Sequence, residues 1–278
     1  MSNFEHAYID LVSQVIKTGE TRPSRAGNVL SLFGTMLKIE CLEEGYFPIL
    51  TQRRVFPVGV FGELAAFLQG AEDLVTFKNF GCNYWDVNAA AWYPNTGLET
   101  KDQVVGRIYG AQWRNWTSSE GPVDQLAGLV EGLKQNAYGR RHLLTTYNPA
   151  ELAEGCLPPC HLLAQFNVRT SKHLDCIVTM RSVDLCLGLP SDIILYATLM
   201  LLLCNETGCI PGKLTFMLGD THVYANHVSQ FQAHTQRQMY RLPAFELNES
   251  AKLDTFRTED MRLINYQHSG VLSYELNP

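Results

Sequence analysis

Apolar positions recur at helical spacing in three parts of the chain. In residues 8–16 they lie on one face, and Gly19 then interrupts the pattern. Residues 58–69 are apolar nearly all round and residues 123–135 on one side only, which predicts a buried helix and a surface helix. A further helix is predicted to begin at Ile193, in the longest apolar run, which is too short to span a bilayer.

Apolar runs of strand length occupy much of the rest. They cover residues 142–147, 162–168, 174–180 and 214–218, and an earlier one begins near Val29. The short link RTSKH between the second and third of these runs predicts a hairpin. Because there is no repeat, linker or low-complexity tract, we expect one domain over 1–278 that mixes helices and strands.

Two polar stretches adjoin these strands. Residues 21–28 are predicted as a polar loop, in which Arg25 stands beside small residues and would suit a phosphate. Residues 219–227 (GDTHVYANH) are predicted to follow the last strand and to open a helix at His222 and Tyr224.

The composition is that of a globular protein, with 46% hydrophobic and 18% charged residues among 278. The net charge of −6 argues against binding of polymeric nucleic acid, so an anionic ligand must be met by a local group of arginines. Eight cysteines without regular spacing indicate reduced thiols rather than disulfides. Because the N-terminus also lacks a signal-peptide pattern, we expect a cytoplasmic protein with no membrane partner.

The most informative stretch is EGCLPPCHLLAQFNV, residues 154–168. Two prolines stiffen the backbone before Cys160, and His161 opens the apolar run after it, so the thiol is held in a rigid turn. A nucleophilic cysteine needs such a position. A buried cysteine that packs as a small hydrophobe would fit the same pattern.

Glu63 lies inside the most apolar of the predicted helices. Burial would raise its pKa toward the range useful for proton transfer, and a buried ion pair is an equally open interpretation. The aromatic-rich residues 77–116, with Trp85 and Tyr109, would suit a wall for a flat ligand or a plain core. Arg181 is a second candidate for a phosphate.

Several motifs, in this order along the chain, resemble the thymidylate synthase family. The most specific are RIYGAQWR at 107–114, LPPCHLLAQF around Cys160, RSVDLCLGLPSD at 181–192 and GDTHVYANH at 219–227. SRAGNVLSLFG, FPILTQRR, GELAAFLQG and INYQHSG support them, and the match covers almost the whole chain. The resemblance implies an α+β fold with a mixed β-sheet covered by helices, in a homodimer whose sheets stack back to back. It also implies a one-carbon transferase that uses a pyrimidine nucleotide and 5,10-methylenetetrahydrofolate, without a metal.

The family's roles fall on named positions of this chain. The resemblance implies that Cys160 adds to C6 of the pyrimidine and that Glu63 orders water and moves protons, with Tyr109 and His161 beside the nucleophile. The implied phosphate ligands are Arg25, Arg181 and Ser182 of the same subunit and, from across the dimer, Arg140 and Arg141. The implied sugar ligands are His222 and Tyr224. The implied folate contacts are Arg53, Trp85, Asp184, Leu187 and Gly188.

Asp192 departs from the family's pattern. In thymidylate synthases this position is Asn, whose amide matches O4 and N3–H of uracil, whereas a carboxylate accepts from the 4-amino group of cytosine and from a protonated N3. Against uracil, the carboxylate would set acceptor against acceptor, a costly mismatch in a dry site. With Asp at position 192, the chain resembles the phage deoxycytidylate hydroxymethylases, which indicates dCMP as substrate. The alternative is that Asp192 only caps the helix predicted from Ile193.

The resemblance leaves the second half of the reaction open. A hydroxymethylase lets water attack an exocyclic methylene on the base, where a synthase delivers a hydride from the folate. Asn88, where synthases commonly have a Trp, and the polar tail SYELNP favour water and thus 5-hydroxymethyl-dCMP. Trp85 is retained, so a dCMP methylase stays open, as do a CMP hydroxymethylase and a dUMP-using synthase. By the same resemblance the source would be a phage that modifies its DNA, which places the protein in the host cytoplasm.

Two other functional classes would also act on nucleotides. A zinc cytidine deaminase needs His-x-Glu and Pro-Cys-x-x-Cys, but Cys156 and Cys160 are four residues apart and no His-x-Glu occurs. A nucleotide-binding or RNA-binding protein without catalysis is the other alternative, and the intact set of Cys160, Glu63, Arg181 and His222 favours turnover instead.

Overall fold

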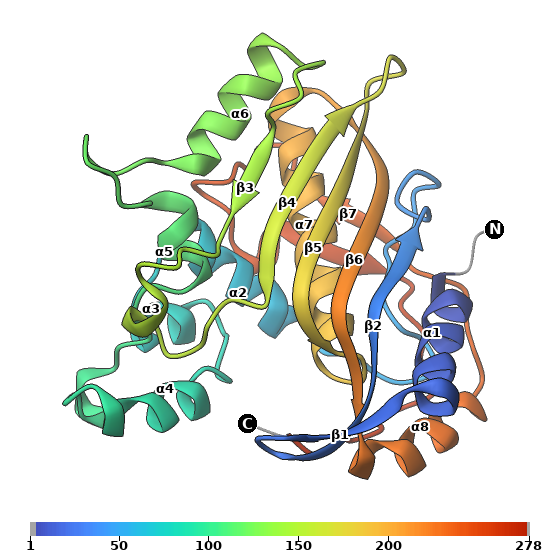
Figure 1. Cartoon of the computed structure of the whole chain (residues 1–278). Helices are drawn as coiled ribbons and strands as arrows, with labels where there is room; N and C mark the ends of the chain where they lie inside the picture. The colour runs from blue at the N-terminus through green and yellow to red at the C-terminus, as the bar shows by residue number, and fades with distance from the viewer. Residues whose placement is uncertain (1–3, 277–278) are drawn as a thin grey trace.

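The computed structural model describes residues 4–276, and a six-stranded sheet forms its centre (Figure 1). In spatial order the strands are β1 (Glu20–Ser24), β2 (Gly27–Ile39), β6 (Ile210–Tyr224), β5 (His173–Asp184), β4 (His161–Val168) and β3 (Leu143–Thr145). β5 and β6 are parallel, and the other neighbouring strands are antiparallel. A second sheet pairs β7 (Ala244–Leu247) with β8 (Met261–Ile264). The predicted α+β class with a mixed sheet is confirmed.

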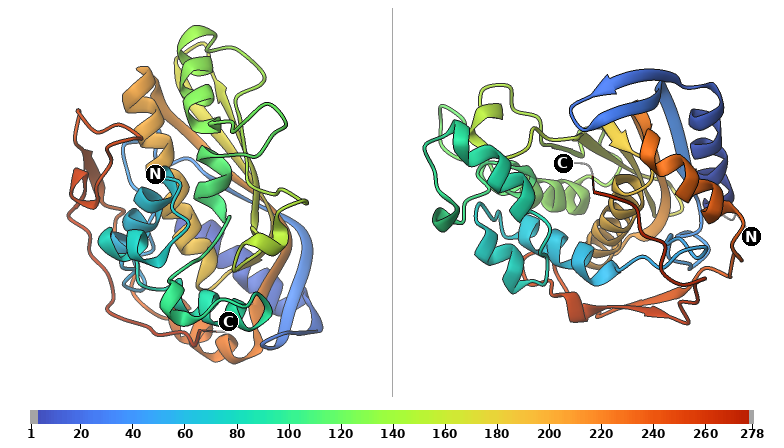
Figure 2. Two further views of the ribbon diagram at one scale, coloured as in Figure 1. Left: turned by 90° about the vertical axis from the view of Figure 1, so that its left-hand side faces the viewer. Right: turned by 90° about the horizontal axis from the view of Figure 1, so that it is seen from below.

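The helices gather mainly on one side of the large sheet (Figure 2). The α-helices are α1 (Phe4–Thr18), α2 (Pro57–Leu68), α3 (Leu74–Asn79), α4 (Asp86–Trp92), α5 (Tyr109–Arg114), α6 (Gln125–Gln135), α7 (Gly188–Thr207) and α8 (Val228–Thr235). The short 3-10 helices are η1 (Tyr93–Asn95), η2 (Thr100–Asp102), η3 (Leu152–Glu154), η4 (Ala225–His227) and η5 (Thr258–Asp260). α1, α2 and α6 lie within a few residues of their predicted positions.

α7 is the central helix of the core, because it connects the two parallel strands β5 and β6 and packs against both. It has 20 residues and is buried on most sides. It begins at Gly188 rather than at Ile193, because Pro190 is compatible with the first turn of a helix. By length and apolar composition, α7 is also the one helix of residues 4–276 that could cross a membrane, but most of it is buried inside the protein, as in a core helix.

The earlier start of α7 corrects one prediction. Leu187, not Asp192, is the N-cap residue of this helix. Asp192 lies inside α7, where its side chain is directed away from the helix's own backbone and toward His161. The helix-capping interpretation of Asp192 is therefore wrong.

The large sheet has one buried face and one open face. On β6 the side chains of Leu214, Phe216 and Leu218 are buried, whereas Met217 between them is exposed. Ile177 on β5 is exposed on the same open face. It pairs with Thr215, which lies two residues before Met217 and therefore on the same face of β6. In Figure 1 the open face is turned toward the viewer, and no helix of the described part of the chain covers it.

Two polar stretches form strands where loops or helices were predicted. Residues 20–24 pair with β2 as β1, and Arg25 lies in the hairpin turn. All of β1 is exposed, so this strand has no buried face that would produce an apolar alternation. β6 continues past Leu218 to Tyr224, because its backbone stays paired with β2. His222 and Tyr224 are thus strand residues, and they do not open a helix.

Close packing on α2 positions the segment that precedes α4. A side-chain carbon added to Gly62 would lie 2.1 Å from the carbonyl oxygen of Phe80, and one added to Gly59 would lie 3.5 Å from the ring of Tyr84. Glycine at position 62 therefore allows Phe80 to lie directly on α2, whereas a methyl group at position 59 would make only an ordinary contact. This contact places Tyr84 and the following Trp85 beside Glu63.

We expect Gly62→Ala to lower the free energy of unfolding by more than about 2 kcal/mol, because the added methyl meets backbone that cannot move cheaply. The matched control is Gly128→Ala in α6, where nothing lies within 4 Å of the added carbon, and which should be neutral or more stable by roughly 0.5–1 kcal/mol. Chemical denaturation of both variants measures the difference. Equal stability of the two would contradict the close packing of α2 on residue 80.

Candidate active site

The topology brings the ends of four strands together. β5 and β6 are parallel, so both end at the lower edge of the sheet in Figure 1, where the antiparallel strands β4 and β2 begin. The residues that this edge assembles are Cys160, directly before β4, Arg181, Ser182 and Asp184 at the end of β5, His222 and Tyr224 at the end of β6, and Arg25 in the turn before β2. Candidate residues from four distant parts of the chain thus share one edge.

The turn at Cys160 is fixed from two sides. Its backbone N–H donates to the Tyr109 hydroxyl at 2.8 Å. The Arg181 guanidinium donates to the carbonyl oxygens of Pro159 and Pro158 at 2.8 and 2.7 Å, and it lies 3.7 Å from the Cys160 Sγ. Burial raises the pKa of the Cys160 thiol, and the nearby Arg181 charge opposes this, as does that of Arg25. The predicted rigid turn is confirmed, and its arginine favours the thiolate.

Asp192 and His161 form a direct pair. The Oδ1 atom of Asp192 lies 2.7 Å from the Nε2 atom of His161, and the Tyr196 hydroxyl lies 3.2 Å from the Nδ1 atom of the same ring. A carboxylate only accepts, so Nε2–H donates to Asp192 and Nδ1 accepts from Tyr196. The Asp192 side chain is 16% exposed, so it can still be reached from the site.

Glu63 is held by two donors from the segment before α4. The Tyr84 hydroxyl donates to its Oε2 at 2.7 Å, and the Trp85 indole N–H donates to its Oε1 at 2.8 Å. Burial raises the pKa of Glu63 to about 7, against the lowering effect of these two hydrogen bonds. Of the two interpretations drawn from the sequence, a buried ion pair is not what holds this carboxylate.

The sugar-binding candidates lie side by side on β6. The rings of His222 and Tyr224 are perpendicular, with centroids 5.3 Å apart. The His222 Nδ1 lies 3.4 Å from Asp220 but makes no hydrogen bond to it, and Asp220 accepts hydrogen bonds from Arg22 and Ser31. The Arg22 guanidinium is thus paired with the Asp220 carboxylate.

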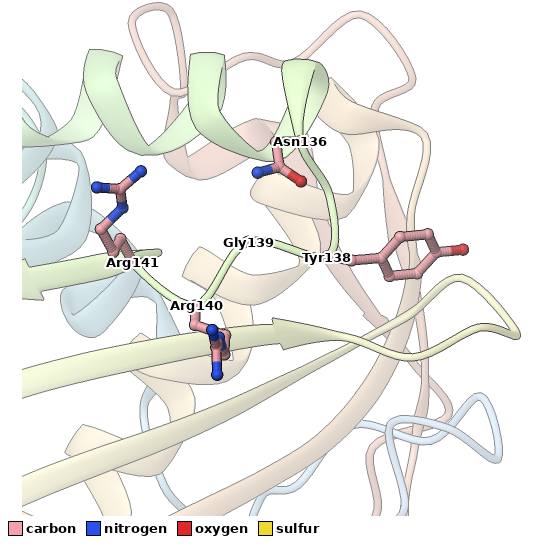
Figure 3. A pocket seen from close by; sticks show the side chains of 5 residues that line it. All are labelled: Asn136, Tyr138, Gly139, Arg140 and Arg141. Carbon is pink, nitrogen blue, oxygen red and sulfur yellow. The ribbon is translucent and has the colours of Figure 1, made fainter.

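Arg140 and Arg141 lie elsewhere in the same chain. They are exposed in the loop between α6 and β3, around a cavity of about 470 Å³ that Asn136, Tyr138 and Gly139 also line (Figure 3). The carbonyl of the next residue, His142, accepts a hydrogen bond from the backbone N–H of Phe166 on β4. Phe166 is six residues after Cys160, which corresponds to about 20 Å along the strand. Within one chain these two arginines therefore do not join the other site residues.

The folate-binding candidates surround the junction between β5 and α7. The half-buried Asp184 carboxylate accepts from the Cys186 N–H at 2.8 Å, and desolvation raises its pKa. Arg53 is buried, donates to the Cys186 carbonyl at 2.6 Å and lies against the ring of Tyr274. Leu187 and Gly188 begin α7 beside them, whereas Trp85 lies deeper, in contact with Glu63.

One group in the described residues has metal-ligand character. Atoms of Asp184, Cys186 and His227 lie within 4.8 Å of one another. Two of these ligands already have partners, since Asp184 accepts from the backbone of Cys186 and the His227 Nε2 bonds to the carbonyl of Glu275.

Sequence reasoning missed two tyrosines. Tyr84 bonds to Glu63 and Tyr196 to His161, but neither stands in a polar motif that would mark it. Tyr196 lies inside the apolar run of α7, where a hydroxyl implies a buried partner. Tyr84 precedes Trp85 directly, and that neighbourhood is the only signal it offers in the sequence.

Comparison with known proteins gives a consistent match. The family model described as "Thymidylate synthase" matches residues 6–277. "Thymidylate synthase 1/2" of Encephalitozoon cuniculi (strain GB-M1) is 36% identical over 276 residues, which cover 94% of this chain and 93% of that protein. The "Bifunctional dihydrofolate reductase-thymidylate synthase" of Leishmania major is 36% identical and that of Leishmania amazonensis 37%. This chain spans about half the length of the two bifunctional proteins, 55% and 53%.

Because the pKa of Glu63 is raised in the folded protein, the free energy of unfolding should depend on pH. The folded protein must carry a buried charge above a pH of about 7, so Glu63 lowers the free energy of unfolding as the pH rises from about 5 to 8. We expect Glu63→Gln to remove this loss, making the variant more stable than wild type by up to roughly 3 kcal/mol at pH 8 but not at pH 5. Denaturant titrations at one protein concentration measure it, with the exposed Glu120→Gln as control. A constant difference between wild type and Glu63→Gln at both pH values would be the contrary result.

Proposed function

The chain belongs to the thymidylate synthase family, and we propose that it is a deoxycytidylate hydroxymethylase of this family. As a member, it is a one-carbon transferase that acts at C5 of a pyrimidine nucleotide with methylenetetrahydrofolate as donor. The proposed form, a single catalytic domain over 1–278, takes dCMP and water and makes 5-hydroxymethyl-dCMP.

The pair of Asp192 and His161 carries this proposal. Because His161 donates to Oδ1 of Asp192, the carboxylate is oriented, and Oδ2 is the oxygen available to a ligand. An oriented acceptor pairs with the 4-amino group of cytosine, whereas uracil would place its own acceptor O4 there. A buried acceptor without a donor costs about 1–3 kcal/mol, so the site should reject uracil.

The other proposed roles follow the geometry of the site. Cys160 adds to C6 of cytosine, and C5 becomes nucleophilic. The phosphate is held by Arg25, Arg181 and Ser182, and the sugar hydroxyl by His222 and Tyr224. Tyr109 fixes the Cys160 backbone, and His161 orients Asp192.

The folate-binding residues fit such a donor. The Nε atom of Arg53 is buried without a hydrogen-bond partner in residues 4–276, and Asp184 offers a half-buried carboxylate. Together with Leu187, Gly188 and Trp85 they would hold the folate, which supplies the one-carbon unit. No metal takes part in the proposed mechanism.

Water capture completes the proposed reaction. The oxygen of water bonds to the exocyclic methylene carbon on C5, and one water proton passes to the Glu63 carboxylate. The methylene electron pair moves to C5 and re-forms the C5–C6 double bond as the Cys160 thiolate leaves. With a pKa of about 7, Glu63 can take up and release this proton near neutral pH.

We propose that the chain acts as a homodimer, because Arg140 and Arg141 do not reach the site of their own subunit. The open face of the sheet supplies the surface: Met36 and Met217 pair on it, with Ile177 nearby, and all three are exposed. Packing two such faces back to back would bury these apolar side chains. It would also let a partner's arginines approach the phosphate.

Exchanging the base-selecting residue tests the substrate. Asp192→Asn should lower kcat/KM for dCMP and raise it for dUMP, changing their ratio by on the order of 10³-fold, because the amide matches uracil. Asp10→Asn, an exposed position on α1, is the control and should leave the ratio unchanged. A variant that keeps the wild-type preference would overturn the role of Asp192.

Mixing two inactive variants tests the dimer. Cys160→Ser and the double variant Arg140→Ala/Arg141→Ala should each lose most activity, and random exchange of their subunits should restore about a quarter of the sites, since one site of each mixed dimer is intact. In the control mixture, Cys160→Ser with Arg181→Ala, no site is intact, because Cys160 and Arg181 belong to the same subunit's site. Absence of recovery in the first mixture would show that the arginine pair does not act across subunits.

A further inference from the structure

Tyr84 is the more exposed of the two side chains that hold the buried Glu63. Glu63 is 8% exposed and Trp85 is 4% exposed, whereas Tyr84 is 43% exposed. The inner end of Tyr84, its hydroxyl, lies 2.7 Å from the Glu63 Oε2 atom. One end of this side chain therefore contacts the carboxylate, and much of the remainder is accessible from outside.

The two partners of Glu63 differ in what they can do. The indole N–H of Trp85 can only donate, so it suits an Oε1 atom that carries no proton. A phenol hydroxyl can donate to a carboxylate and can accept from a carboxylic acid. When Glu63 takes up a proton, Oε2 is therefore the oxygen that receives it, and the Tyr84 hydroxyl turns from donor to acceptor.

We propose that Tyr84 is a positioning residue for Glu63, because its hydroxyl holds Oε2 in the orientation in which this oxygen takes up the proton of the attacking water. The inference rests on the proposed role of Glu63 in water capture, but not on which nucleotide the site selects.

The titratable groups around Glu63 determine which of them can take up a proton. The charged or titratable groups that face it are Tyr84 and Cys82 from the segment before α4, Asp192 from α7 and His161 from β4. Burial and the charge of Glu63 raise the pKa of Tyr84 well above its usual value, so the phenol stays neutral and acts as a hydrogen-bond donor to Glu63 rather than as a base. The pKa of Cys82 is likewise raised, to about 12, so its thiol stays protonated.

The backbone holds this arrangement in place. Gly62, adjacent to Glu63 in α2, allows Phe80 to approach the helix, and the ring of Tyr84 lies near Gly59, one turn earlier. The approach of residue 80 therefore brings Tyr84 to α2.

The test compares Tyr84→Phe with Tyr93→Phe. The first variant keeps the ring and removes only the hydroxyl at Glu63, and the second removes a hydroxyl that donates to the backbone carbonyl of Val104. Because the Tyr84 hydrogen bond lowers the pKa of Glu63, its loss should move the acid limb of the kcat profile upward by roughly half to one pH unit. At pH 7, kcat should fall by about 2- to 5-fold, because a smaller share of Glu63 is then deprotonated, with KM for nucleotide and folate nearly unchanged.

An unchanged acid limb in Tyr84→Phe, or an equal shift in Tyr93→Phe, would overturn the inference, because a merely structural hydroxyl would not move this limb selectively. The profile is measured with whichever nucleotide the wild type turns over best. If that nucleotide is dUMP, the proposed substrate fails while the comparison of the two tyrosines still stands or falls on its own.

Discussion

The parallel pairing of β5 with β6 is the constraint on which the rest of the structure depends. Two parallel neighbours need a connection that crosses from one end of the sheet to the other, and here that connection is α7. The helix must pass over the inner face, which is why it is apolar on nearly all sides. Its first turns then lie beside the end of β5, where Asp192 meets His161 at the start of β4.

Two carboxylates in this site receive different environments and therefore different proposed tasks. Asp192 is oriented by an imidazole and stays reachable, which suits recognition of a base. Glu63 is buried behind Tyr84 and Trp85, and its pKa of about 7 suits proton transfer. The charge of Asp192 itself helps to raise the pKa of Glu63, so the base-selecting and proton-transferring groups are electrostatically linked.

Much of the fold was predictable from periodicity, because α2, α6 and the hairpin of β4 and β5 bury regular faces. β1 and the end of β6 were not, since exposed or polar strands are specified by backbone pairing with β2 rather than by side-chain pattern. The edge that unites Cys160, Arg181 and His222 came from the family resemblance, and no local pattern would have assembled it. The position of Tyr84 beside Trp85 did not predict its contact with Glu63, because that contact depends on the close approach of two segments at Gly62.

The measurement that bears most directly on the central claim is product analysis of the wild-type enzyme. The protein is incubated with methylenetetrahydrofolate and dCMP, dUMP or CMP, the absorbance of dihydrofolate is followed, and the nucleotide product is weighed by mass spectrometry. The account predicts 5-hydroxymethyl-dCMP without formation of dihydrofolate. 5-Methyl-dCMP with dihydrofolate would contradict water capture but keep the choice of base, and preferred turnover of dUMP would contradict the role assigned to Asp192.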